Sequence, residues 1–326
     1  MAHRPVLEVK DLRTSFRLHK QDYEVLHGVS FEVARHETLC VVGESGCGKS
    51  VMTLSVMGLL PENATVSAQS IRLDGQELRG LNERQMNNVR GRRMGMIFQE
   101  PMTCLNPLLS IGKQMREGLM LHLGLSRREA EHAAVAMLNK VGVSNPEERL
   151  KQYPFQLSGG LRQRVMIAMA LSLNPILLIA DEPTTALDVT IQKQVLLLLK
   201  QLKQSMDAGV LFITHDLGVV AEIADRVIVL YAGVKVEEGP VRAIFENPGH
   251  PYTRGLMAAV PNIKSDSYAP TPIPGSPPNI AQDIPGCRFH PRCARAADIC
   301  KKEAPLLHTL GPGHLAACHL FKEVSA

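Results

Sequence analysis

The sequence contains no tryptophan and few aromatic residues, which make up 4% of its 326 residues. The aromatic residues are not interleaved with the short basic clusters, such as Arg90, Arg92 and Arg93. Aromatic side chains that stack on bases are the usual means of holding single-stranded nucleic acid. The sequence therefore gives little support to a nucleic-acid partner, and its basic clusters are typical of a solvated face.

The sequence also lacks a long apolar run and a strong net charge. Runs such as Ile176–Ala180 and Val195–Leu199 fall far short of the roughly 20 residues that span a bilayer. The N-terminus is charged throughout and has no apolar core, so no secretory signal is expected. The net charge is +4, from 36 basic and 32 acidic residues, which is too small to indicate a polyanionic partner. We expect a protein that does not cross a membrane by itself and whose seven cysteines stay reduced.

Short β-rich runs alternate with helical stretches, which predicts an α/β fold with parallel strands. The expected strands are Val6–Val9, Val25–Val33, Thr38–Val42, Met94–Phe98, Ile176–Ala180, Val210–Thr214 and Arg226–Leu230, the first two at an antiparallel edge. The expected helices are Lys49–Leu59, Ile111–Val141, Leu161–Leu173 and Val189–Met206.

The composition changes near the end of the chain. Seven prolines lie between Pro261 and Gly286, too many for a helix or a central strand. We predict a nucleotide-binding domain over residues 1–260, a proline-rich linker over 261–286 and a cysteine-rich segment over 287–326.

A glycine-rich run follows the expected strand Thr38–Val42 and matches the P-loop pattern. Its glycines let backbone amides curl around phosphates, the lysine supplies charge to the β- and γ-phosphates, and the last serine reaches Mg²⁺. The alternative is a glycine-rich turn that matches by chance. The predicted phosphate-binding residues are Gly43, Glu44, Ser45, Gly46, Cys47, Gly48, Lys49 and Ser50.

Two acidic residues end the apolar strand Ile176–Ala180. Ligands of open α/β sheets bind at the carboxyl ends of strands, where Asp181 would assist Mg²⁺ and Glu182 would polarise an attacking water. Alone, the pair could equally be solvated acids. Together with a P-loop, it indicates ATP hydrolysis.

The run Leu157-Ser158-Gly159-Gly160-Leu161 resembles the signature motif of the ABC transporter ATPases, with Leu161 in place of the usual glutamine. The alternative is a plain helix N-cap with two glycines. The resemblance implies a P-loop core of ABC type, with a mixed sheet, an antiparallel β subdomain and an α-helical subdomain. It also implies that Ser158, Gly159 and Gly160 grip the nucleotide held by another ATPase subunit.

Further residues match family positions in the same order. Gln99 corresponds to the glutamine that senses the γ-phosphate and contributes to the Mg²⁺ site, Asp188 to the D-loop, and His215 to the switch histidine. The resemblance implies catalytic roles for Glu182, His215 and Gln99, although His215 alone would suit an ordinary strand end. Adenine stacks on an aromatic residue in this family, for which Tyr23 is the candidate and Phe16 the rival.

The C-terminal motifs His250-Pro251-Tyr252-Thr253 and Gly286–Cys293 resemble the oligopeptide/dipeptide (and nickel) importer ATPases, and the likeness covers nearly the whole chain. It implies a peripheral ATPase at the cytoplasmic face of the cell membrane that powers uptake of di- and oligopeptides. The implied partners are a second homologous ATPase subunit forming a heterodimer, two transmembrane permease subunits and an external solute-binding protein, with no nucleic acid.

The cysteine-rich segment contains Cys287, Cys293, Cys300 and Cys318. Four thiolates suit an iron–sulfur cluster or zinc, but the short Cys-x₂₋₄-Cys spacing usual for zinc is absent. The resemblance implies a [4Fe-4S] cluster beside the ATP and Mg²⁺ of the main domain. Unconnected thiols remain an alternative, and a ligand could instead come from His290, His314 or His319.

Three other functions remain open from the sequence. The same type of subunit could serve nickel, glutathione or another small solute. A soluble ABC ATPase acting on nucleic acid would usually carry paired cassettes, coiled-coil inserts or basic arms, which are not apparent. A non-catalytic module is disfavoured by the presence of Glu182 and His215.

Overall fold

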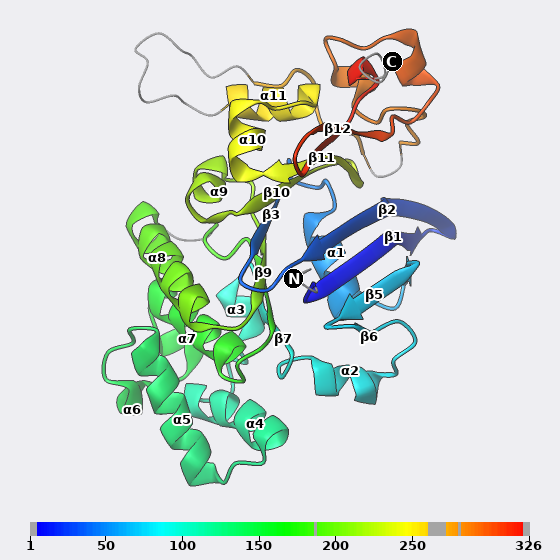
Figure 1. The fold of residues 1–326 in the computed structure, drawn as a ribbon. Helices are drawn as coiled ribbons and strands as arrows, with labels where there is room; N and C mark the ends of the chain where they lie inside the picture. Colours follow the sequence, from blue (N-terminus) through cyan, green and yellow to red (C-terminus); the bar gives the residue numbers. More distant parts are fainter. Residues whose placement is uncertain (1–4, 186–187, 260–271, 280–281, 322–326) are drawn as a thin grey trace. The chain divides into compact units, whose positions relative to one another are not determined.

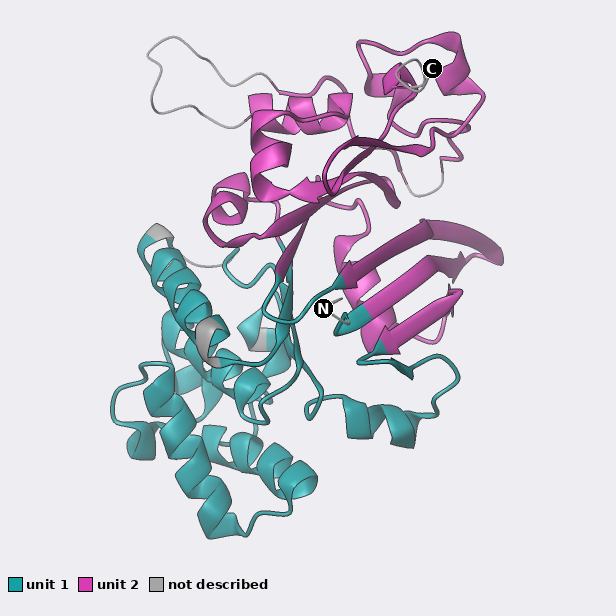
Figure 2. Cartoon of the chain, in the orientation of Figure 1, with its two compact units in different colours: residues 1–7, 33–37, 73–213 teal, residues 8–32, 38–72, 214–326 magenta. Residues whose placement is uncertain are grey.

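A computed structural model describes residues 5–185, 188–259, 272–279 and 282–321 (Figure 1). The chain divides into two compact units (Figure 2). Unit 1 comprises Met1–Leu7, Val33–Glu37 and Leu73–Ile213, and unit 2 comprises Glu8–Glu32, Thr38–Arg72 and Thr214–Ala326.

Unit 1 is built on three parallel strands, β7 (Met94–Ile97), β8 (Leu177–Asp181) and β9 (Gly209–Ile213), with β8 in the middle. Every residue of these strands is buried, as their apolar sequences require of parallel strands covered on both faces. Helix α7 (Gly159–Leu171) packs on β7. A side chain at Gly95 would overlap the carbonyl of Ala170, so glycine allows this close approach.

The helices expected at Leu161–Leu173 and Val189–Met206 are present, whereas the region predicted as helical from Ile111 to Val141 is divided in two. Helix α4 (Ile111–Leu123) ends at Gly124, whose φ of 67° suits glycine. Helix α5 (Arg127–Lys140) begins with a capping box between Ser126 and Glu129. The other helices are α2 (Glu83–Val89), α3 (Pro101–Cys104), α6 (Pro146–Arg149) and α8 (Val189–Ser205).

The main sheet of unit 2 starts from β3 (Thr38–Val42), as predicted, which pairs in parallel with β10 (Arg226–Tyr231). Strand β11 (Val234–Pro240) is antiparallel to β10. Two strands that were not predicted, β12 (Leu307–Gly311) and β13 (His314–Ala317), extend this sheet, because β13 pairs with β11. The cysteine-rich end of the chain is thereby joined to the strand that follows β10.

A second sheet of unit 2 has the order β2-β1-β5, with β4 antiparallel to β1. Its first two strands are far longer than predicted because His19 and Lys20, with φ of 50° and 67°, form a tight connection between them. Its strands are β1 (Leu7–Leu18), β2 (Gln21–Val33), β4 (Ala64–Ser67) and β5 (Ser70–Leu73), and the two-residue strand β6 (Gln76–Glu77) falls in unit 1.

The helices of unit 2 are short. They are α1 (Lys49–Met57), α9 (Leu217–Ile223), α10 (Val241–Glu246) and α11 (Pro251–Ala258). Helix α1 ends at Met57, two residues before the predicted end at Leu59. It is capped by Gly58, whose φ is 61°, and does not continue to Pro61.

Residues 261–271 and 280–281 of the predicted linker lie outside the described residues, and its remaining described part contains neither helix nor strand. The three domain boundaries stay a prediction. Within the described ranges, no helix is both long and apolar enough to span a bilayer.

Candidate functional site

The glycine-rich run links β3 to α1 and curves tightly, as a phosphate-binding loop requires. A side chain at Gly43 would overlap the carbonyl of Leu230, and one at Gly48, where φ is 103°, would come within 2.8 Å of Leu26. Nothing lies within 4 Å of the position that a side chain would take at Gly46. The backbone therefore fits a loop that is open on one side only.

Lys49 stabilises this curve from within. Its side chain is 5% exposed, and Nζ donates to the carbonyls of Gly43 at 2.8 Å and Glu44 at 3.1 Å. Helix α1 begins at Gly48 without a side-chain cap, and the first N–H groups of a helix attract anions. The loop thus combines a cation with a helix N-terminus, which fits the phosphates of ATP.

Three more predicted residues belong to unit 2. Ser50 lies in the first turn of α1, and His215 is exposed after Thr214, whose amide donates to the Val41 carbonyl at 3.3 Å. Tyr23 is half-buried on β2, where its hydroxyl donates to Gln21 at 3.1 Å. The rival, Phe16, is half-buried on β1 and pairs in register with Ala64 of β4. Neither aromatic residue is favoured over the other, so the adenine contact stays a prediction.

Unit 1 brings the predicted catalytic glutamate and glutamine together. The side-chain amide of Gln99 donates to Oε2 of Glu182 at 3.3 Å, and the hydroxyl of Thr185 donates to the same oxygen at 2.9 Å. Glu182 has φ of 45°, a conformation that costs a non-glycine residue about 1–3 kcal/mol. Its amide is held by the Ile213 carbonyl at 2.9 Å. The glutamate is thus fixed just past the end of β8 by neighbouring strand β9.

The other acidic residue, Asp181, is the last residue of β8 and is 5% exposed. Asp188 caps helix α8, since its side chain accepts hydrogen bonds from the amides of Thr190 and Ile191 at 3.0 Å. Ala186 and Leu187 of the same predicted D-loop lie outside the described residues.

The signature run starts helix α7, as an anion-binding site at a helix N-terminus should. Ser158 is the N-cap, and its hydroxyl accepts from the amide of Leu161 at 3.4 Å. The space beside Gly159 is open, whereas a side chain at Gly160 would come within 3.3 Å of Ile191. The predicted residues are therefore placed where a second phosphate grip could form.

Residues near the P-loop include several to which the sequence analysis assigned no role. The guanidinium of Arg292 makes two hydrogen bonds to the carboxylate of Glu44, at 2.6 and 3.0 Å. The amide of Glu44 donates to the hydroxyl of Tyr252 at 2.8 Å. Arg292 and Tyr252 both lie in the C-terminal motifs that carried the resemblance. Those motifs were the available signal, but nothing local to them indicates contact with the P-loop.

The four C-terminal cysteines line one cavity of about 480 Å³. The amide of Cys287 donates to the carbonyl of Cys300 at 2.8 Å, and Cys318 directly follows β13. His290 and His319 line the same cavity, whereas Nε2 of His314 donates to the Glu237 carboxylate at 2.7 Å. Within the described ranges, no group of three or more His, Cys, Asp or Glu side chains is placed to hold a metal ion. The four predicted cysteine ligands thus line one cavity, but no three of the described side chains are placed around a single ion position.

Burial and mutual repulsion control the charge of these thiols. Burial, followed by the neighbouring Cys300, Cys318 and Cys293, raises the pKa of Cys287 to about 11. Burial also raises the pKa of Cys293 and of Cys318. Near neutral pH these three thiols are therefore protonated unless a bound cation replaces the protons.

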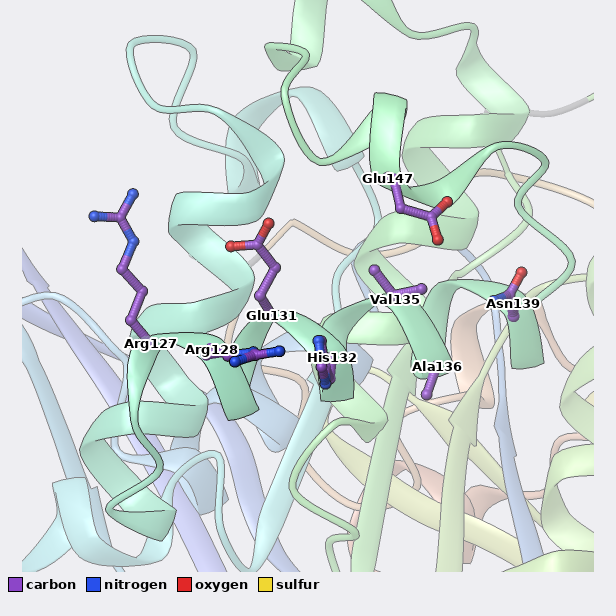
Figure 3. A pocket seen from close by; sticks show the side chains of 8 residues that line it. All are labelled: Arg127, Arg128, Glu131, His132, Val135, Ala136, Asn139 and Glu147. Atoms are coloured by element: carbon purple, nitrogen blue, oxygen red, sulfur yellow. The ribbon is translucent and has the colours of Figure 1, made fainter.

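A separate hollow of about 740 Å³ lies on unit 1 and contains none of the predicted site residues. Figure 3 shows its lining, which comes from one face of α5 together with Glu147 of α6. Arg127, Arg128, Glu131 and His132 give this face mixed charge, which is typical of a solvated helix.

Comparison with known proteins identifies the family. The family model described as "ABC transporter" matches residues 26–185, and "Oligopeptide/dipeptide transporter, C-terminal region" matches residues 236–300. The oligopeptide transport ATP-binding protein OppD of Salmonella typhimurium is 48% identical over 319 residues, which cover 98% of this chain and 94% of OppD. This chain belongs to the ATP-binding subunits of the peptide ABC transporters.

Other ABC transporter proteins agree with this placement. The oligopeptide transport ATP-binding protein AppD of Bacillus subtilis is 48% identical over 322 residues, which cover 98% of each chain. The solved ATP-binding cassette MJ0796, a dimer bound to ADP and Pi, superposes with a TM-score of 0.65 at 27% identity. That match covers 72% of this chain and 99% of the cassette. The predicted α/β fold of ABC type, with its mixed sheet, is thereby confirmed, as is the assignment to the transport ATPases.

Proposed function

We propose that this ABC ATPase binds and hydrolyses ATP to drive the uptake of di- and oligopeptides across the cytoplasmic membrane. The observation that carries the proposal is the P-loop, in which Lys49 is buried beneath a loop that its own hydrogen bonds keep curved. The peptide substrate follows from the relatives, whose names specify oligopeptide and dipeptide transport.

ATP and Mg²⁺ would be held by the residues that the sequence predicts for them. The backbone of Gly43–Ser50 and the Lys49 ammonium would bind the phosphates. Tyr23, the candidate from the sequence, or its rival Phe16 would stack on adenine. Ser50, Gln99 and Asp181 would complete the Mg²⁺ site, where the ion neutralises charge on the transferring phosphoryl group. Serine, amide and carboxylate oxygens are the ligands that Mg²⁺ prefers.

Glu182 is the residue that we assign as the general base. A carboxylate can accept a proton from water as the water attacks the γ-phosphate. In the present structure its Oε2 accepts hydrogen bonds from Gln99 and Thr185, which hold the carboxylate in one orientation. His215 would stabilise the attacking water or the γ-phosphate from the end of the Gly209–Ile213 strand.

The active site would be completed by a second, homologous ATPase subunit. The Ser158–Gly160 turn at the start of α7 would bind the γ-phosphate held by the partner, and Asp188 would lie at the same interface. Support comes from the related cassette MJ0796, which was solved as a dimer. Two permease subunits and an external solute-binding protein would complete the importer, with this chain peripheral at the cytoplasmic face.

The test is Mg-ATPase activity of the purified chain, measured alone and after reconstitution with its membrane and ATPase partners. A composite site predicts poor activity in the dilute chain and a rise on adding the partners. Full activity that does not depend on chain concentration would contradict a composite site. Uptake of labelled dipeptide into vesicles, compared with labelled nickel, would then decide the substrate.

We further propose that Cys287, Cys293, Cys300 and Cys318 hold a [4Fe-4S] cluster within the segment 287–326. Each iron of such a cluster takes one thiolate, so the ligands surround a volume rather than a point. That requirement suits the four cysteines, which line one cavity of about 480 Å³. Structural zinc usually shows Cys-x₂₋₄-Cys pairs, which this segment lacks. When bound, the cluster would supply the cross-links that a small segment needs to hold its shape.

A further inference from the structure

The ion pair between Arg292 and Glu44 joins two sites that are remote in the sequence. Arg292 directly precedes Cys293, and Glu44 is the second residue of the P-loop. Nη1 of Arg292 donates to Oε2 of Glu44 at 2.6 Å and Nη2 donates to Oε1 at 3.0 Å, so the pair is bidentate. The arginine side chain is 6% exposed and that of glutamate 25%. Bidentate, desolvated pairs fix direction as well as distance.

The surroundings of Arg292 hold it in this position. Its side chain donates to the carbonyls of Pro274 at 2.9 Å and Gly275 at 3.2 Å, and its guanidinium lies 5.9 Å from the ring centre of Tyr231. The hydrogen bond to Glu44 raises the pKa of Arg292 above its ordinary value. Two backbone carbonyls, an aromatic ring and the Glu44 carboxylate therefore act on one charged side chain.

An aromatic cluster supports the same connection. The ring of Phe289 packs edge-on against Tyr231, with centroids 5.1 Å apart, and lies 5.4 Å from Tyr252. Tyr252 in turn accepts the hydrogen bond from the Glu44 amide at 2.8 Å. The cysteine-rich segment thus reaches Glu44 in two ways. Arg292 of the segment bonds to the Glu44 side chain. Phe289 of the segment packs on Tyr252, whose hydroxyl accepts from the Glu44 backbone amide.

We propose that Arg292 is a positioning residue of the P-loop, through which the four-cysteine site controls the affinity for nucleotide. The inference rests on the proposed function in that the P-loop binds ATP. Glu44 places a carboxylate in a loop whose ligand is a polyanion. Arg292 neutralises that carboxylate and turns it toward the cysteine-rich segment. A disturbance at Cys293 shifts Arg292, because the two residues are adjacent in the chain.

The first arm of the test compares the nucleotide affinity of full-length variants by fluorescence titration. Arg292→Ala leaves the Glu44 carboxylate uncompensated beside the phosphates, and we expect the Kd for Mg-ATP to rise about tenfold, or about 1.4 kcal/mol. The effect should shrink at high salt, because the repulsion is screened. Arg292→Lys keeps the charge but not the bidentate geometry, so an intermediate Kd is expected.

The control is Arg242→Ala, which breaks an exposed Arg–Glu pair at 2.8 Å elsewhere in unit 2 and should leave the Kd unchanged. Adding Glu44→Gln to Arg292→Ala removes the uncompensated charge and should recover most of the affinity. A role limited to holding the segment together would not be rescued in this way. An unchanged Kd in folded Arg292→Ala protein, or no rescue, would overturn the proposal.

The second arm tests control by the cysteine site, whatever that site binds. We expect Cys293→Ser to raise the Kd for Mg-ATP in the wild-type background. In the Arg292→Ala background the same substitution should raise the Kd little further. The control, Cys104→Ser, should leave the Kd unchanged in both backgrounds. If Cys293→Ser raised the Kd by the same factor in both backgrounds, the effect of the cysteine site would not pass through Arg292, and the proposal would be refuted. Iron and sulfide content, measured on the same samples, decides the cluster independently. If the wild-type protein bound no nucleotide at all, the result would instead count against the proposed function.

Discussion

Gln99 and Glu182 are connected by a hydrogen bond of 3.3 Å between the side-chain amide and the carboxylate oxygen Oε2, which also accepts from Thr185. They are far apart in the sequence, and each comes just after the end of a parallel strand, β7 or β8. Two donors on one oxygen hold the carboxylate in one orientation. The arrangement suits a group that must later accept a proton from water.

Replacing Glu182 with Gln should preserve nucleotide binding and abolish turnover. The amide keeps the shape of the carboxylate but cannot act as a base, and loss of a general base typically costs about 10²–10⁴-fold in rate. We expect a stable closed dimer with ATP, detected by size-exclusion chromatography. Hydrolysis at the wild-type rate would show that another group accepts the proton.

Replacing Lys49 with Ala should weaken nucleotide binding itself. The variant removes the cation from the loop and also the two hydrogen bonds to the carbonyls of Gly43 and Glu44 that keep the loop curved. Affinity for Mg-ATP should fall by at least about tenfold, because charge-assisted contacts are the stronger ones. The exposed Lys10→Ala is the matched control. Equal affinity of Lys49→Ala and wild type in titration would contradict the P-loop assignment.

Protein purified without oxygen should be brown and should contain iron and sulfide in equal amounts. Replacing Cys293 with Ser should open the C-terminal segment to proteolysis, since metal ligation supplies much of the folding free energy of small segments. The exposed Cys104→Ser should have no such effect. Colourless protein with one zinc per chain would overturn the cluster.

The stability of the chain should fall in acid because of His250, which is 1% exposed. Burial lowers its pKa to about 3, and its Nδ1 accepts from the Tyr252 amide at 3.0 Å. Below about pH 6.5 His250 binds a proton in the unfolded chain but stays neutral in the folded chain. The free energy of unfolding therefore falls with decreasing pH, by up to about 1.4 kcal/mol per unit between about pH 6.5 and 3.

Replacing His250 with Asn should flatten this acid slope while keeping an acceptor for the start of α11. Chemical denaturation at several pH values measures the slope. The exposed His36→Asn should leave it in place. Identical slopes for His250→Asn and the wild type would place the acid sensitivity in other groups.

The local elements of the fold could be predicted because their physical cause is local. Thr38–Val42 and the strand ending at Asp181 are continuous apolar runs, as buried parallel strands must be. The antiparallel sheet was predicted poorly, since β1 and β2 continue through polar, exposed residues as far as the tight connection at His19 and Lys20. Strands β12 and β13 were missed because only pairing with β11 gives them a partner.

The sequence by itself predicted the chemistry of this protein. Residue type and spacing indicate the roles of the P-loop glycines, Lys49, the acids after Ile176–Ala180 and the signature run, because a turn around phosphate tolerates few alternatives. The tertiary structure alone decided which distant side chains meet. Arg292 and Glu44 are separated by 248 residues, and no periodicity can encode their pairing, which depends on how β10, α11 and the cysteine-rich segment pack together.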